Sequence, residues 1–172
     1  IGYIPQMIFM LDDTIRKNVA FGVPEDKIDE DRLWEVLKEA QLDEFIKTLP
    51  EGLETGIGER GIRLSGGQRQ ALALLMATMT PIDFLILDEH TAALDPKTAE
   101  IIMELTDQVV KEKKVTTIMV THNLRYAVEY GNRLIMMHEG KAILDKAGEE
   151  KKTINTEEIM AIFNRISVEC GN

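Results

Sequence analysis

The spacing of apolar positions changes along the chain. In the first half apolar residues mostly recur at helical intervals, so we expect helices at about residues 13–20, 29–40, 43–49 and 66–78. In the second half short apolar runs alternate with helical stretches. There we expect strands at about 84–87, 115–120, 133–137 and 141–144, and helices at about 96–113, 124–130 and 156–166. Alternating strands and helices indicate a parallel α/β core.

These elements predict three parts. Residues 1–8 hold the end of a core strand and the loop after it, residues 9–80 form a helical subdomain, and residues 81–172 form an α/β portion with a C-terminal helix. The chain opens on the apolar run Ile1 to Ile4, which is typical of the end of a strand. We therefore expect the chain to begin inside a domain.

Composition narrows the function classes. The chain has 172 residues, enough for one domain with a core, and its net charge of −10 argues against nucleic acid as a partner. No segment approaches the roughly 18 apolar residues of a membrane helix, so any link to a membrane should go through a partner. The single Cys170 excludes an intramolecular disulfide and favours a reducing compartment.

Five short motifs occur in order along the chain. They are Gln6 after the first apolar strand, the run Leu64 to Gln68 at the start of a helix, Asp88-Glu89 at the end of a strand, Leu94-Asp95 shortly after it, and Thr121-His122 after the next strand. This order resembles the Q-loop, signature, Walker B, D-loop and H-loop of ABC ATPases, over nearly the whole chain. The resemblance implies a P-loop NTPase fold of the α/β class, with a helical signature subdomain and part of a parallel-sheet, RecA-like core.

The signature run has a physical basis for anion binding. Ser65 lies where a helix begins, so its hydroxyl and the N–H groups after it can face an anion, and Gly66 and Gly67 let that anion come close. A plainer alternative makes Ser65 only a helix N-cap. The resemblance implies that Ser65, Gly66, Gly67 and Gln68 bind the γ-phosphate of ATP held by an opposite subunit, and that Asp95 acts across the same interface.

Asp88 ends a buried strand, which is where α/β sheets place their ligands. The resemblance implies that Asp88 and Gln6 hold Mg²⁺, that Glu89 is the general base, and that Gln6 and His122 order the attacking water. The alternatives are a solvated strand end for Asp88-Glu89 and a capping or core role for His122.

The resemblance also implies partners and a location. It implies ATP and Mg²⁺ as cofactors, a second ABC ATPase domain in a head-to-tail dimer, and a transmembrane transporter domain that holds the chain at the cytoplasmic face of a membrane. The turn Glu59-Arg60-Gly61 resembles the X-loop with which exporters touch that domain. An ordinary Gly-rich turn is the alternative.

The P-loop that such an ATPase needs is missing from this sequence. The only Gly-Lys pair, Gly140-Lys141, is followed by Ala142 instead of Ser or Thr. We therefore expect no appreciable ATPase activity from the chain alone. Two alternatives remain open: a non-catalytic module that presents its signature motif to a partner ATPase or membrane domain, and a non-transport ABC ATPase.

The two halves of the chain also resemble different branches of the family. Residues 1–70 resemble exporters, whereas residues 71–172 resemble importer-type proteins. This contrast predicts a C-terminal fragment or a chimera joined near the signature. His90 departs from the small residue or Pro that usually follows the catalytic Glu, and could be a packing residue.

Overall fold

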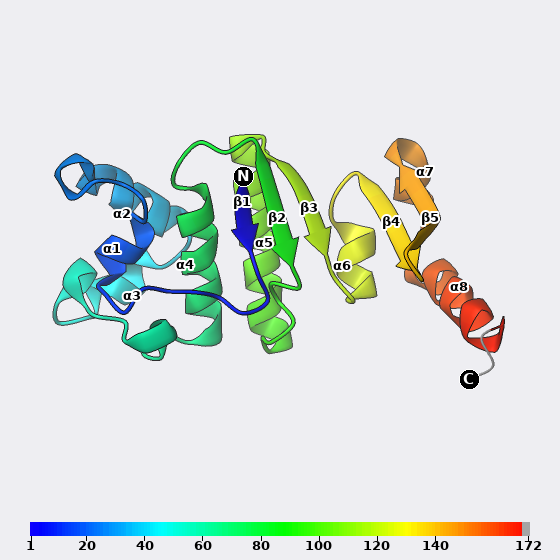
Figure 1. Ribbon diagram of the computed structural model, residues 1–172, viewed down its shortest axis with the longest axis horizontal. Helices are drawn as coiled ribbons and strands as arrows, with labels where there is room; N and C mark the ends of the chain where they lie inside the picture. The colour runs from blue at the N-terminus through cyan, green and yellow to red at the C-terminus, as the bar shows by residue number, and fades with distance from the viewer. Residues whose placement is uncertain (170–172) are drawn as a thin grey trace. The chain divides into compact units, whose positions relative to one another are not determined.

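The computed structural model describes residues 1–169, so Cys170 lies outside the described residues (Figure 1). The chain forms two compact units, one from Ile1 to Val120 and one that begins at Thr121. This division lies after residue 120, whereas the sequence predicts a boundary near residue 81. The limits 1–8, 9–80 and 81–172 remain a prediction about subdomains.

The first unit contains most of the predicted helices and strands. In order they are β1 (Gly2–Ile4), α1 (Ile15–Val19), η1 (Glu25–Lys27), α2 (Glu30–Glu39), α3 (Asp43–Lys47), η2 (Gly52–Glu54), η3 (Glu59–Gly61), α4 (Gly66–Thr78), β2 (Phe84–Asp88), α5 (Pro96–Lys113) and β3 (Thr116–Val120). The stretch 52–61, which carries several glycines, forms the two 3₁₀ turns η2 and η3.

The three strands form a parallel sheet in the order β1-β2-β3, which confirms the predicted parallel core. Leu85 and Leu87 of β2 are fully buried and belong to one apolar cluster with residues of α4 and α5. Alternate residues point to the opposite face of the sheet. On that face Tyr3, Ile118 and Val120 are exposed. One face of the sheet is therefore packed by helices and the other is open.

Buried Asn18 fixes the chain between β1 and α1. Its side-chain amide accepts a hydrogen bond from the Leu11 N–H (2.9 Å) and donates to the carbonyls of Leu11 (3.1 Å) and Thr14 (2.9 Å). The residue itself is 0% exposed. The side chain thus supplies the hydrogen bonds that this irregular backbone cannot make within a helix or strand.

The second unit contains α6 (Leu124–Glu129), β4 (Arg133–His138), β5 (Lys141–Ala147), α7 (Gly148–Thr153) and α8 (Thr156–Glu169). β4 and β5 form a separate antiparallel pair. The expectation that the strand at 133–137 joins the parallel core is therefore wrong. The turn residues Glu139 and Gly140 both have positive φ (47° and 76°), which suits a tight hairpin.

Buried Lys151 anchors the end of α6 within this unit. Its ammonium donates to the carbonyl of Val128 and to that of Tyr130 (2.9 Å), both at the C-terminal end of the helix. A cation there interacts favourably with the helix dipole. Among the residues that the structure describes, no helix is both long and apolar enough to cross a membrane.

Candidate functional site

The end of β2 carries the two predicted carboxylates. Asp88 is the last residue of the strand, and Glu89 follows with a φ of +48°. The Glu89 N–H donates to the Val120 carbonyl at the end of β3 (2.9 Å), and the Glu89 carbonyl accepts from the Ala92 N–H (2.9 Å). A positive φ at a residue other than Gly is strained, and it persists because neighbouring structure holds it. The turn after β2 is therefore fixed against the end of β3.

Gln6 lies at the same edge of the sheet. Ile4, the last residue of β1, pairs with Leu87, and the strands are parallel, so the segments that follow both strands leave the sheet on one side. Gln6 is exposed two residues beyond β1. The fold thus brings the loop carrying Gln6 to the sheet edge that carries Asp88 and Glu89.

Sequence reasoning missed Tyr3, whose hydroxyl donates to Asp88 Oδ2 at 3.3 Å. The contact depends on the register of β1 against β2, which pairs Tyr3 with Ile86. Nothing in the sequence states that register. The alternation of side chains along each strand would have revealed the contact only once the pairing was known.

The signature run begins α4 as predicted. Ser65 Oγ accepts from the Gln68 N–H (3.2 Å), and Gln68 Oε1 accepts from the Ser65 N–H (2.9 Å), so the two residues form a capping box. Ser65 is therefore an N-cap. Its hydroxyl proton is not used by that bond and can still be donated to an anion.

Gly66 and Gly67 have a packing role that sequence reasoning missed. A Cβ on Gly66 would lie 2.9 Å from Leu94 Cδ2, and one on Gly67 would lie 2.5 Å from Thr98 Cγ2. Both distances are shorter than real Cβ contacts. The absence of side chains thus lets the start of α4 pack directly against the start of α5, whether or not an anion also approaches.

We expect Gly67→Ala to lower the free energy of unfolding of the first unit by about 1 to 3 kcal/mol, because a methyl group there forces Thr98 to move. Gly56→Ala is the matched control, since a Cβ at Gly56 meets nothing within 4 Å. Urea unfolding followed by fluorescence of Trp34, the only tryptophan, reports on this unit. Equal unfolding midpoints for the two variants would contradict the packing role.

Asp95 caps α5, with Pro96 in the first turn. Its carboxylate accepts from the Thr98 N–H at 3.1 Å, and hydrogen bonding to Thr98 holds the pKa of Asp95 below its usual value. Leu94 and Thr98, which flank this cap, are also the residues that Gly66 and Gly67 approach. The structure therefore brings Asp95 and the signature run together within one chain.

The turn η3 packs between two of the predicted motifs. A Cβ on Gly61 would lie 2.8 Å from Met10 Sδ, in the segment that follows Gln6. Arg69 Nη1, just after the signature run, donates to the carbonyls of Leu64 (2.9 Å) and Gly61 (3.4 Å). Glu59 and Arg60 point outward and are exposed.

His90, the residue after Glu89, is buried, at 3% exposure. Its Nε2 is 3.3 Å from Thr106 Oγ1, and Thr106 Oγ1 donates its own proton to the Ile102 carbonyl (2.7 Å). His90 Nε2 must therefore be the donor, which assigns the neutral Nε2–H tautomer. Burial lowers the pKa of His90 from 6.5 to about 4. His90, which stands where a small residue or Pro usually follows the catalytic Glu, is thus a packed and hydrogen-bonded side chain.

This burial predicts a pH dependence of stability. Between pH 6.5 and about 4 the unfolded chain binds a proton at His90 and the folded chain does not, so stability falls as the pH falls through this window, by about 3 kcal/mol in total. His90→Gln keeps a donor for Thr106 and removes the titration. Its unfolding free energy, measured in urea with Trp34 fluorescence, should therefore fall less than that of the wild type. An equal loss of unfolding free energy with falling pH in His90→Gln and in the wild type would contradict the prediction.

His122 belongs to the second unit, two residues beyond the end of β3. The Asn123 N–H donates to Thr121 Oγ1 (3.0 Å), and the Asn123 side chain caps α6 by accepting from the N–H groups of Arg125 and Tyr126. These local bonds fix the backbone on both sides of His122. The side chain of His122 is exposed, so it is not a core residue.

The donor set at the β2 edge fits Mg²⁺ bound to ATP. Among the described residues no three His, Cys, Asp or Glu side chains form a group that could hold a metal. Mg²⁺ commonly takes only one or two protein carboxylates and completes its shell with phosphates and water. Asp88, with the amide of Gln6 on the neighbouring loop, matches that smaller set of oxygen donors.

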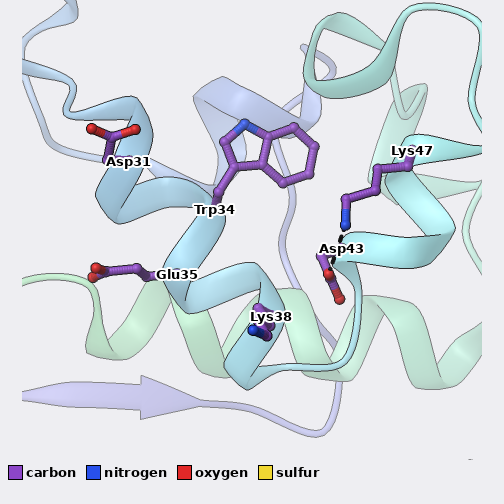
Figure 2. Close-up of a pocket in the computed structure, with 6 residues that line it drawn as sticks. All are labelled: Asp31, Trp34, Glu35, Lys38, Asp43 and Lys47. Carbon is purple, nitrogen blue, oxygen red and sulfur yellow. Dashed lines mark hydrogen bonds and ion pairs between the residues drawn. The ribbon is translucent and has the colours of Figure 1, made fainter.

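A separate hollow lies over α2 and α3. It measures about 390 Å³ and contains none of the predicted site residues. Figure 2 shows the Trp34 indole beside it, and the ion pair of Asp43 with Lys47 (3.1 Å) on the α3 side. Its lining consists of Asp31, Trp34, Glu35, Lys38, Asp43 and Lys47.

Comparison with known proteins places these features in a family. The family model described as ABC transporter matches residues 1–92, a range that continues across residue 70, where the two resemblances meet. The tyrosine transport ATP-binding protein of Clostridioides difficile is 41% identical over 150 residues, which are 87% of this chain and 60% of that protein. The ATP-dependent lipid A-core flippase of Cupriavidus metallidurans is 35% identical over 167 residues, or 96% of this chain and 27% of that protein.

A solved structure agrees with the sequence matches. A bacterial Atm1-family ABC exporter with ATP bound superposes with a TM-score of 0.74 at 28% identity, covering 94% of this chain and 28% of that one. This chain thus spans 60% or less of each of these three proteins. With its parallel sheet and its signature helix, the chain belongs to the ABC transporter family and has the fold of part of that family's nucleotide-binding domain.

Proposed function

We propose that this chain is the later part of an ABC ATPase domain that binds and hydrolyses ATP with Mg²⁺ to drive transport across a membrane. The observation that carries the proposal is the β2 edge. There Asp88 and Glu89 end a buried strand, the backbone of Glu89 is tied to Val120, and the loop of Gln6 leaves the neighbouring strand on the same side. In doubly wound sheets this edge is where nucleotides bind.

Each candidate site residue has a role in this proposal. Asp88 and Gln6 hold Mg²⁺, Glu89 takes a proton from the attacking water, and His122 orders that water. Mg²⁺ supplies neutralisation of the phosphate charge when it is bound. Ser65 donates its hydroxyl proton, and the first N–H groups of α4 face the γ-phosphate on a second ATPase domain. Asp95 meets that same second domain.

An apolar surface supports docking to a transmembrane partner. Met7 (70% exposed), Phe9 (77%) and Ile62 (77%) lie in the segment after Gln6 and directly after η3, and the Met10–Gly61 approach brings these two segments together. Exposed apolar side chains that gather at one place mark interaction sites. In the proposed complex the chain is held at the cytoplasmic face of the membrane by this contact.

Split-enzyme complementation tests the proposal. The 172-residue chain alone should show no ATPase activity, because its sequence contains no P-loop. Mixing it with a separately expressed P-loop-bearing fragment of an ABC ATPase domain should restore hydrolysis that requires Mg²⁺. The readout is phosphate release as a function of the concentration of the added fragment.

The same experiment separates the alternatives. Binding of the P-loop fragment without hydrolysis would replace the proposal with the non-catalytic interaction module. Robust hydrolysis by the chain alone would contradict the predicted dependence on a P-loop. A non-transport ABC ATPase would hydrolyse ATP after complementation but would not bind a transporter membrane domain. If the proposal holds, Phe9→Ser on the apolar surface should weaken binding of that membrane domain.

A further inference from the structure

Tyr3 reaches the carboxylate on which the proposed metal chemistry depends. In the β1–β2 register Tyr3 pairs with Ile86, and Asp88 lies two residues further along β2, on the same face of the sheet. The phenol hydroxyl approaches Asp88 Oδ2 to 3.3 Å. An ionised carboxylate only accepts hydrogen bonds, so the hydroxyl of Tyr3 is the donor.

This hydrogen bond is not needed to satisfy the tyrosine itself. Tyr3 is 54% exposed, so water could serve its hydroxyl equally well. A phenylalanine would fill the same place on the sheet face. The Tyr3 hydroxyl therefore matters mainly for Asp88. It holds the Asp88 carboxylate in one orientation, in which Oδ2 accepts the hydrogen bond and Oδ1 is left for another ligand.

We propose that Tyr3 is a positioning residue that orients the Asp88 carboxylate for Mg²⁺ in the ATPase site. The inference rests on the proposed function, because it presumes that Asp88 serves the metal. Groups that hydrogen-bond to a metal-binding side chain fix its orientation, and losing one typically costs roughly 10-fold to 100-fold in metal affinity. The bond is exposed to solvent, so we expect the lower end of that range.

The test uses Tyr3→Phe in the full chain, complemented with the P-loop fragment. Binding of Mn²⁺ in the presence of a non-hydrolysable ATP analogue is measured by electron paramagnetic resonance. Tyr3→Phe should weaken Mn²⁺ binding about tenfold. The Mg²⁺ concentration for half-maximal ATPase activity should rise by the same factor while kcat at saturating Mg²⁺ stays unchanged. The urea midpoint of the chain should not move, because the hydroxyl is solvent-accessible.

Asp88→Asn supplies the matched background. If Tyr3 acts through the carboxylate, Tyr3→Phe should have no further effect on Mn²⁺ affinity in Asp88→Asn, which is the signature of direct coupling in a double-mutant cycle. Equal Mn²⁺ affinities for wild type and Tyr3→Phe would overturn this inference alone, as would an undiminished effect in Asp88→Asn. A wild-type complex that binds no Mn²⁺ with nucleotide would overturn the proposed function, and the inference with it.

Discussion

Replacing Glu89 with Gln is expected to lower ATP turnover by the complemented chain by roughly 100-fold to 10,000-fold, the range associated with loss of a general base. The amide of Gln occupies the same volume but does not take a proton from water at neutral pH. Glu89 sits in a turn whose backbone is tied to Val120 and Ala92, so its place at the β2 edge is fixed. We therefore expect Glu89→Gln to lower ATP turnover strongly and to change the free energy of unfolding little.

Two measurements make this result specific. Glu89→Gln should still bind a fluorescent ATP analogue in the complemented complex, because the proposed phosphate and metal contacts belong to other residues. Glu104→Gln, an exposed glutamate on α5, is the control and should leave turnover unchanged. Turnover by Glu89→Gln within threefold of wild type would remove Glu89 from the role of base.

Asn18→Ala is expected to destabilise the first unit by about 2 kcal/mol or more. The substitution leaves the Leu11 N–H and the Leu11 carbonyl without the side chain that now bonds them, whereas the Thr14 carbonyl keeps its bond from the Asn18 backbone N–H (3.1 Å). Each buried polar group that loses its partner costs about 1 to 3 kcal/mol. The effect should be largest in the segment between β1 and α1, because these bonds fix its backbone.

Lys17→Ala provides the control on the same helix. Lys17 is exposed, and its 3.4 Å ion pair with Asp13 is a surface interaction worth about 1 kcal/mol or less. Both variants are compared by urea unfolding with Trp34 fluorescence, and hydrogen exchange at Leu11 reports on the segment directly. A loss for Asn18→Ala no greater than that for Lys17→Ala would mean that water replaces the lost bonds.

Periodic elements of this fold could be predicted from the sequence, because burial imposes its period on the residues. The apolar run of β2 and the helical spacing of α2 and α5 are examples, and each lies within two residues of the predicted limits. The helix α7 was not predicted, since Gly148 to Thr153 has no apolar period and Lys151 is buried through hydrogen bonds to carbonyls.

Some features of the candidate site could likewise be predicted from the sequence and others could not. The positions of Asp88 and Glu89 at a strand end follow from local pattern, and so does the N-cap at Ser65. The link from Tyr3 to Asp88 depends on strand register, and the need for glycine at position 67 depends on the approach of Thr98. Neither is encoded in neighbouring residues of the chain, so local sequence reasoning could not find them.

The close approach of Gly67 to Thr98 has a mechanical consequence. Close-packed segments transmit displacement, because no void lies between them to absorb it. A push on the first turn of α4 must therefore move the first turn of α5, and Asp95 at its cap moves with it. A partner that docks on both Ser65 and Asp95 thus contacts two helix starts that move together, and the close contact at Gly67 is what couples them.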